Sequence, residues 1–326
     1  MIPRRLWRSA LFVLEYLVGG AIIYWLWHKD ILDVAPLRTI PASLVVAGIA
    51  FALAMVYLAS LRLKFLLRDQ DIRITARRCF FFNCLSIFYS MFLPGGFSGD
   101  AARAYYLLRE IGHNRAGLVG SLILDRLLGL LAMVGLGTVS SAFLVLGNPW
   151  LFGYFLNLLA VFAIGLAGVG WLLYIERRPP KPGSSNVMVR LYDFIHNLVA
   201  RLNISAHSRK TLAYAMVLSV VIHSLSIFLI FLCSRHNDSG LGLLGVYSVA
   251  PFGLLANALP ISPGGLGVGE QSFELLYRLV GARNGASSFL TARFFIYSPA
   301  LLGALVAATL FLRLHKMALF QGSRGK

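Results

Sequence analysis

Apolar runs of about 20 residues alternate with short polar segments along most of this 326-residue chain. A helix needs about 20 apolar residues to cross a hydrocarbon core of roughly 30 Å, so each run predicts a membrane-spanning helix. The pattern therefore predicts an all-α polytopic membrane protein. Six full spans are expected, at about 10–28, 41–61, 118–146, 150–175, 212–234 and 287–312.

Two further apolar pieces, 79–93 and 241–260, are short or interrupted, and Pro251 is expected to break the second one. They lead into the similar motifs Pro94-Gly-Gly-Phe-Ser-Gly-Asp100 and Pro263-Gly-Gly-Leu-Gly-Val-Gly-Glu270. Both motifs begin with Pro-Gly-Gly and end in glycine and a carboxylate. Helix-breaking backbone beside a carboxylate, at matching positions in two halves of a chain, is typical of transporter binding sites.

The distribution of Lys and Arg predicts the orientation of the chain. Four segments are rich in basic residues, namely 1–8, 62–78, 176–210 and 313–326. Three loops hold few of them, namely 28–38, 147–149 and 235–238. The positive-inside rule puts the rich segments in the cytoplasm. Both termini are therefore expected there, and 176–210 is expected to be a cytoplasmic basic linker.

This orientation makes the two motif segments return to the side from which they start. The segment 79–115 starts and ends inside, whereas 241–286 starts and ends outside. Residues 79–93 would cover only about 22 Å as a helix, too little to cross the membrane. We therefore expect two re-entrant hairpins of opposite orientation, related as an inverted-topology repeat. The first half of this repeat covers about 41–146 and the second half about 212–312. Both belong to a single domain, 1–326.

Composition limits the partners of the chain. A net charge of +17 would suggest nucleic acid for a soluble protein, but this chain is 58% hydrophobic and only 13% charged. Its basic residues lie mostly in short loops between apolar runs, where topology and anionic lipid at the cytoplasmic face explain them better. We expect no nucleic-acid partner. The three cysteines lack metal-ligand spacing, and no metal or cofactor is expected.

Carboxylates and arginines recur together in both halves. Asp100 and Glu270 end the motifs, and Arg126 and Arg293 follow them within apolar spans. An Arg inside a span is costly unless it is paired or hydrated. We therefore expect two buried ion pairs, Asp100–Arg126 and Glu270–Arg293. Each pair could bind a ligand, or it could cap a helix and fix a hairpin to its neighbour, and the sequence leaves both readings open.

Other polar residues surround these pairs. Asn83 and Asn257 precede the motifs, Arg103 follows Asp100 by about one helical turn, and Asp125 adjoins Arg126. They could contact a lipid phosphate or satisfy buried polar groups. The motif prolines and glycines are the candidates for hairpin backbone that approaches a ligand closely. They are Pro94, Gly95, Gly96, Gly99, Pro263, Gly264, Gly265, Gly267 and Gly269.

At these residues the chain resembles the lysylphosphatidylglycerol synthase transmembrane-region family, also described as the flippase-like membrane domain. The resemblance covers nearly the whole chain and rests on 93–100 with Arg103, on Leu124-Asp-Arg-Leu-Leu-Gly129, and on 259–270. It implies an all-helical protein of the bacterial inner membrane, whose two-domain relatives translocate aminoacylated phosphatidylglycerol. Because the sequence ends at Lys326 without a soluble synthase domain, we expect no lipid aminoacylation.

Three functions stay open. The first is a translocase that moves a phosphate-bearing headgroup, of a membrane phospholipid or a polyprenyl-linked lipid, through a polar cavity between the hairpins. The second is an integral-membrane transferase acting on a polyprenyl-linked sugar, with Asp30 or Asp33 in an external loop. The third is a non-catalytic scaffold for a separate lipid-modifying enzyme. We favour a transporter over an enzyme, because two carboxylates with no surrounding motif are a weak signal for a transferase. A scaffold is disfavoured because it needs no intramembrane carboxylate–arginine pairs. The oligomeric state, a homo-oligomer included, is not determined.

Overall fold

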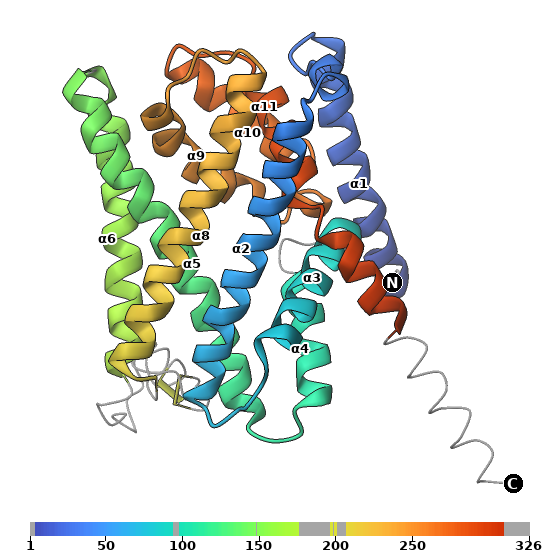
Figure 1. Cartoon of the computed structure of the whole chain (residues 1–326), viewed down its shortest axis with the longest axis vertical. Helices are drawn as coiled ribbons and strands as arrows, with labels where there is room; N and C mark the ends of the chain where they lie inside the picture. The colour runs from blue at the N-terminus through green and yellow to red at the C-terminus, as the bar shows by residue number, and fades with distance from the viewer. Residues whose placement is uncertain are drawn as a thin grey trace, which may run out of the picture.

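The computed structural model describes residues 4–93, 98–147, 149–175, 196–197, 199–200 and 207–309, with the side chains of 4–15 and 173–175 left aside. Every regular element in these ranges is a helix (Figure 1). The predicted all-α class is therefore confirmed. The tip of the first motif, with Pro94, Gly95 and Gly96, and most of the predicted linker 176–210 lie outside the described residues.

Among the described residues, five helices are long and apolar enough to cross a membrane. They are α2 (Ala42–Arg68), α5 (Arg115–Gly147), α6 (Phe152–Ile175) with the preceding η2 (Pro149–Leu151), α8 (Arg209–His236), and α11 (Gly285–Ile296) with its continuation to Thr309. They correspond to five of the six expected spans. α1 (Arg4–His28) covers the sixth, but its side chains are described only from Tyr16 onward, and it is not among the five.

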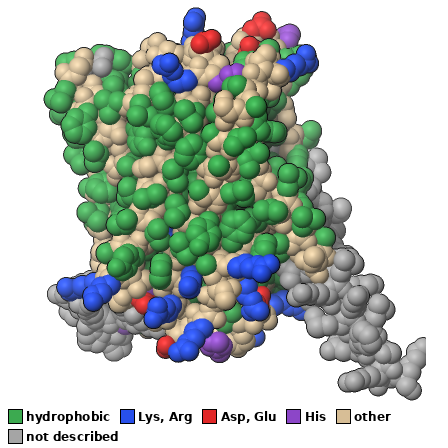
Figure 2. All heavy atoms as spheres, viewed as in Figure 1, with side chains coloured by type: hydrophobic (Ala, Val, Ile, Leu, Met, Phe, Trp, Pro, Cys, Tyr) green, Lys and Arg blue, Asp and Glu red, His purple; other side chains and the backbone are tan. Residues whose placement is uncertain are grey.

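The surface carries an apolar belt between two charged ends. Figure 2 shows hydrophobic side chains over the middle of the visible face, with charged side chains gathered above and below. Large apolar side chains of α5, α6 and α8 are among those exposed, including Leu146, Ile164 and Val217. Such an extended apolar surface matches a lipid environment. Together with the apolar helices, it identifies a multi-pass membrane protein. We call the end where α2 begins the upper end and the end where α2 finishes the lower end.

Two pairs of shorter helices lie between the long ones. α3 (Ala76–Phe92) and α4 (Ser98–Glu110) pack together in the lower half of the molecule (Figure 1). α9 (Leu243–Asn257) and α10 (Val268–Leu279) pack together in the upper half. The 17 residues of α3 extend about 25 Å, less than a hydrocarbon core. Both pairs contain the glycine-rich motifs at or beside their turns.

Glycine is required where the second motif turns. The turn contains η4 (Pro263–Gly265), which packs against α3, so the connection of one helix pair contacts the other pair. Gly264, Gly265 and Gly267 have φ values of 59°, 70° and 81°. Glycine adopts this left-handed region without the steric penalty of a Cβ atom. A Cβ at Gly265 would also lie only 2.2 Å from the carbonyl oxygen of Asn257.

The structure corrects two predictions about where helices are broken. Pro251 does not end a helix but lies inside α9, where its ring packs against Gly137 of α5. This contact has room for the ring because Gly137 has no side chain. By contrast, the last predicted span, 287–312, is interrupted by a turn at 297–299 before helix resumes at 300. Pro299 explains the interruption, since proline disfavours helical geometry at the preceding residue and lacks an N–H.

α2 is longer at its C-terminal end than the sequence predicted. It continues to Arg68, seven residues beyond the expected end of the span at 61. The segment 62–78 is therefore not simply a loop, because its first seven residues complete the helix. Arg62 is buried in this last part of α2.

Candidate functional site

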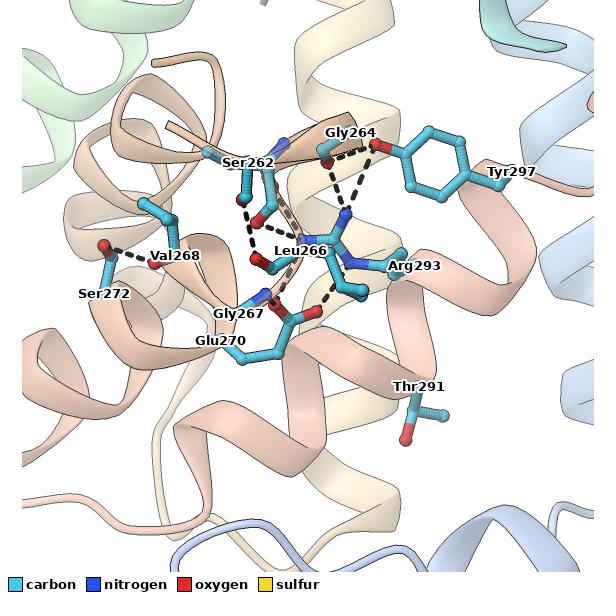
Figure 3. A network of polar contacts seen from close by, with 12 residues as sticks. Ser262, Gly264, Leu266, Gly267, Val268, Glu270, Ser272, Thr291, Arg293 and Tyr297 are labelled. Carbon is cyan, nitrogen blue, oxygen red and sulfur yellow. Dashed lines mark hydrogen bonds and ion pairs between the residues drawn. The ribbon is translucent and has the colours of Figure 1, made fainter. Parts of the chain in front are cut away.

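The upper cluster forms around Arg293 of α11, at the turn of the second motif (Figure 3). Arg293 Nε donates a hydrogen bond to Glu270 Oε1 at 2.6 Å, and Nη2 donates to Oε2 at 3.1 Å. Glu270 is fully buried and Arg293 nearly so. The predicted Glu270–Arg293 pair is thus present and buried. The upper cluster comprises Asn257, Glu270, Arg293, Tyr297 and the carbonyl groups of Gly264 and Gly265.

The protein itself occupies the remaining donors of Arg293. Nη1 donates to the carbonyl oxygen of Gly264 at 2.6 Å and to the Tyr297 hydroxyl at 3.3 Å. Nη2 donates to Asn257 Oδ1 at 2.7 Å and to the carbonyl oxygen of Gly265 at 3.1 Å. A guanidinium group has five N–H donors, and here its three nitrogens all have protein acceptors. Arg293 therefore fastens the turn of the motif to α11.

Glu270 also caps the helix on which it lies. The backbone N–H of Gly267 donates to Glu270 Oε2 at 2.8 Å, at the start of α10. A carboxylate in the first turn is favourable there because the helix N-terminus is partially positive. In the upper cluster both structural roles that the sequence left open, helix cap and ion pair, are present in one residue.

The lower cluster has more charges and joins four helices. It comprises Arg62 of α2, Asn83 of α3, Asp100 and Arg103 of α4, and Asp125 and Arg126 of α5. Within it, Arg126 Nη2 lies 2.5 Å from Asp100 Oδ2, so this predicted pair is also present. Arg103 Nη2 lies 3.2 Å from the other oxygen of Asp100 and 3.4 Å from Asp125 Oδ2. Arg103 thus links the two aspartates.

The inner part of the lower cluster is buried. Arg62 Nε donates to Asp125 Oδ1 at 2.6 Å, and Arg62 Nη1 donates to Ser219 Oγ of α8 at 2.7 Å. Arg103 Nη1 donates to Asn83 Oδ1 at 2.7 Å. Arg103 Nε is buried with no hydrogen-bond partner in the described part of the chain. Protein groups therefore pair with the buried charges of Arg62, Arg103 and Asp125, and only the Nε–H donor of Arg103 has no partner among the described residues.

The outer part of the lower cluster is partly open. The side chain of Arg126 is 45% exposed and that of Asp100 is 28% exposed. The prediction that this pair is buried is therefore wrong. The physical reason is that Arg103, rather than Arg126, occupies the buried position beside Asn83. In the upper cluster Arg293 contacts both the motif carboxylate and the asparagine, Asn257.

The two clusters differ in net charge. In the upper cluster one arginine faces one glutamate, so the charges balance. In the lower cluster three arginines face two aspartates, which leaves one positive charge in excess. A partly exposed arginine beside an excess of positive charge can bind an anion, and guanidinium groups match phosphate oxygens well.

Sequence reasoning missed Arg62, which it assigned to the basic segment 62–78. In the structure Arg62 is buried and forms the shorter of the two ion pairs of Asp125. A signal was present, because an aspartate inside a span requires a cation, and Asp125 was left without one in the predicted pairing. Tyr297 was missed as well; its hydroxyl donates to the carbonyl oxygen of Gly264 at 2.8 Å.

The two candidate aspartates of the transferase hypothesis have local roles at the upper end. Asp33 Oδ1 accepts a hydrogen bond from the backbone N–H of Ala35 at 2.8 Å, at the start of η1 (Ala35–Arg38). The Asp33 backbone N–H donates to Ser287 Oγ at 2.9 Å. Asp30 lies in the turn after α1 with a φ of 52°. These features fit the shaping of a loop.

Fold and site together define a helical membrane protein with two carboxylate–arginine clusters at its glycine-rich motifs. The family described as the lysylphosphatidylglycerol synthase TM region matches residues 12–303, which is most of the chain. The chain belongs to this family, as its motifs predicted. Neither the curated proteins nor the solved structures compared with it give a match.

Proposed function

We propose that this protein is a lipid translocase that moves a phosphate-bearing headgroup across the membrane, rather than an enzyme. The observation that carries the proposal is the lower cluster, where the partly exposed Arg126–Asp100 pair lies beside an excess of positive charge. An intramembrane charge that is accessible from outside the protein interior is a functional candidate by default. Membership in a membrane lipid-related family supports the same class of function.

The proposed mechanism begins with an exchange of anions at Arg126. A lipid phosphate replaces Asp100 as the partner of Arg126, while Arg103 continues to hold Asp100. Arg62 and Asp125 remain paired with each other and stay buried. Because the cluster carries one excess positive charge, one phosphodiester charge neutralises it. The acyl chains remain in the bilayer along the apolar belt of the protein (Figure 2).

We further propose that the α3–α4 and α9–α10 pairs are re-entrant hairpins of an inverted repeat. The contacts of the two halves support this. α2 packs against α3 and α5, and α8 likewise packs against α9 and α11. α5 packs against α8, and α11 likewise packs against α2. Such repeats alternate access to a shared site by movement of one half against the other.

The proposed orientation places the lower end in the cytoplasm. The basic segment 62–78 lies at this end, and the positive-inside rule assigns such segments to the cytoplasmic side. The same rule, applied to the basic segments 1–8 and 313–326, supports cytoplasmic termini, and the proposed membrane is the inner membrane of a bacterium. No P-loop sequence is present in the chain, so a lipid concentration difference or an ion gradient is the proposed source of energy.

A leaflet-exchange assay tests the proposal. Purified protein is reconstituted into liposomes that contain traces of fluorescent phosphatidylglycerol, phosphatidylethanolamine or a polyprenyl phosphate, and dithionite quenching reports how much label crosses. We expect exchange of at least one label by the wild type. Exchange should be roughly tenfold slower or worse for Arg126→Gln, because this substitution removes the cation that binds the phosphate through a charge-assisted contact.

The matched control is Arg78→Gln. Arg78 also lies at the lower end and pairs with an exposed carboxylate, Glu110, but it is outside both clusters. The Arg78→Gln variant should exchange lipid at the wild-type rate. Normal exchange by a folded Arg126→Gln variant would remove the lower cluster from the mechanism. If no label crosses even with an imposed proton gradient, the transferase alternative is tested next, by turnover of a polyprenyl-linked sugar and its loss in Asp30→Asn.

A further inference from the structure

A second cationic site lies at the lower end, where α2 leads into α3. A cavity of about 600 Å³ is present there. Three basic side chains line it, those of Lys64, Arg68 and Arg73, together with the carboxylate of Asp71. We call this site the α2–α3 pocket. Its volume falls within the range of ligand pockets in proteins, roughly 300–1,000 Å³.

The basic residues of the α2–α3 pocket lack protein counter-ions. In the ranges that the structure describes, none of Lys64, Arg68 and Arg73 forms an ion pair with a carboxylate. Nearby Arg78, in contrast, lies 2.7 Å from Glu110. With the Asp71 carboxylate counted, three basic groups leave an excess of two positive charges around the cavity, and a bound anion reduces their repulsion. The pocket therefore matches an anionic ligand.

The walls of the pocket favour an amphipathic ligand over a soluble one. Ile74, which is half-buried, contributes an apolar surface beside the basic groups, and Ile72 behind it is buried in the core. The pocket lies at the last turns of α2, where the apolar belt gives way to the charged lower end (Figures 1 and 2). Lipid phosphates lie at this level of a bilayer, and clustered Lys and Arg attract anionic ones.

The α2–α3 pocket is separate from the lower cluster. Lys64 follows Arg62 by two residues, and residues at this spacing do not share a helix face. Arg62 points to Asp125 inside the protein, whereas Lys64 lines the cavity. Cys79, buried in the first turn of α3, lies within electrostatic range of Lys64 and also of Arg103 and Asp125. The two sites are thus neighbours without shared residues.

The corresponding connection of the other half gives a useful comparison. Between α8 and α9 lies a cavity of about 540 Å³, lined by Arg235, Arg283 and Asp238 among others. It has one basic residue fewer than the α2–α3 pocket, for the same single carboxylate. The stronger anion site is therefore the one at the lower end.

We propose that the α2–α3 pocket binds the phosphate headgroup of an anionic lipid in the adjacent leaflet, as a site distinct from the translocation site. Arg68 and Arg73 contact the phosphate, Lys64 supplies a further charge, and Ile74 contacts the glycerol and upper acyl region. The proposal does not depend on lipid translocation, because the pocket and the lower cluster share no residue.

Lipid binding to the full chain tests the proposal directly. Native mass spectrometry of the detergent-solubilised protein compares phosphatidylglycerol with phosphatidylcholine at several salt concentrations. We expect the wild type to prefer phosphatidylglycerol. Arg68→Gln/Arg73→Gln should lower the phosphatidylglycerol affinity on the order of tenfold, since each lost basic residue near a membrane surface weakens anionic-lipid attraction. The preference should also become less sensitive to salt.

Two controls decide what the result means. Arg77→Gln/Arg78→Gln removes the same number of charges from the same end but outside the pocket, and should change the affinity by roughly twofold or less. Arg126→Gln removes phosphatidylglycerol binding at the proposed translocation site, but the binding that depends on Arg68 and Arg73 should remain in this variant. Equal losses in both double variants would mean general surface attraction and would overturn the proposal. Loss of binding in Arg126→Gln would assign the bound lipid to the lower cluster instead.

The source of the phosphate is tested with soluble competitors. Glycerol phosphate and inorganic phosphate should displace phosphatidylglycerol only weakly, because they lack the apolar part that meets Ile74. Displacement by either competitor at the same concentration as short-chain phosphatidylglycerol would show a site for soluble anions and would overturn the assignment to a lipid.

Discussion

The upper and lower clusters have related sequence motifs but different structures. In each, a motif carboxylate pairs with an arginine of a later helix, at 2.6 Å for Glu270–Arg293 and 2.5 Å for Asp100–Arg126. The upper pair is buried and its arginine is surrounded by protein acceptors, whereas the side chain of Arg126 is 45% exposed. The same pairing therefore gives a closed structural contact in one half and a partly open charged site in the other.

Two substitutions between the halves account for this difference. Arg103 follows Asp100 by three residues, whereas Phe273 follows Glu270 by three residues. The ring of Phe273 stacks on that of Phe289, with the ring centroids 4.2 Å apart. The residue before Arg126 is Asp125, whereas the residue before Arg293 is Ala292. Where the upper half has an apolar ring and a methyl group, the lower half has two charges.

These charges change what the arginine of the later helix must do. In the upper half Arg293 alone bonds the carboxylate, the asparagine and the turn. In the lower half Arg103 bonds the asparagine, Asn83, and the inner aspartate. Arg126 is then not required in the interior. The additional arginines of the lower cluster thus occupy the buried positions and leave Arg126 partly exposed, as the proposed exchange of partners requires.

The largest effect is expected from Arg293→Gln, which breaks the closed cluster. The substitution leaves the fully buried Glu270 carboxylate without its counter-ion. Removing one partner of a buried ion pair costs about 3–5 kcal/mol. Thermal unfolding of the detergent-solubilised protein, followed by tryptophan fluorescence, should show a large decrease in Tm.

The control for this variant is Arg78→Gln. The partner of Arg78, Glu110, is exposed, so the free energy of unfolding should fall by no more than about 1 kcal/mol. If the Arg293→Gln variant were as stable as the Arg78→Gln variant, the upper cluster would not stabilise the fold. The proposed difference between the two halves would then be wrong.

A smaller loss of stability is expected from Gly99→Ala, which disturbs the lower helix pair. A Cβ atom at Gly99 of α4 would lie 2.2 Å from the carbonyl oxygen of Ser86 in α3. Backbone must move to accommodate it, and overpacking of this kind costs about 1–3 kcal/mol. The movement separates α3 from α4 and should slow lipid exchange as well.

Gly112→Ala is the matched control, because no atom lies within 4 Å of a Cβ at that position. Unfolding and leaflet exchange are measured for both variants. A Gly99→Ala protein with unchanged stability would mean that close contact between the two helices is unimportant for the lower half.

The smallest loss of stability is expected from Arg126→Gln, although this variant has the strongest predicted effect on exchange. The Arg126–Asp100 pair is partly exposed, and such pairs contribute about 1 kcal/mol or less. The Tm should therefore stay close to that of the wild type while exchange falls. Both quantities are measured on the same preparation. A decrease in Tm as large as that of Arg293→Gln would mean that the two clusters stabilise the fold equally.

The sequence alone determined the helical class, five helices that are long and apolar enough to cross a membrane, the family, and both carboxylate–arginine pairs. These features follow from local properties. The length and hydropathy of a run decide whether it can cross a membrane. The cost of an isolated intramembrane charge requires that each motif carboxylate and each intramembrane arginine have a partner. The opposed re-entrant hairpins, the orientation and the lipid substrate stay predictions.

Only the tertiary structure decided which arginines are buried and which remains accessible. Arg62 and Asp125 are 63 residues apart, and Arg103 and Asp125 are 22 apart, so their contacts depend on how α2, α4 and α5 pack. Several arginines near one aspartate satisfy the same charge rule, and sequence spacing cannot rank them. The geometry of packing selected Arg62 and Arg103 for the interior and left Arg126 partly exposed, because only their helices bring them to Asp125 and Asn83.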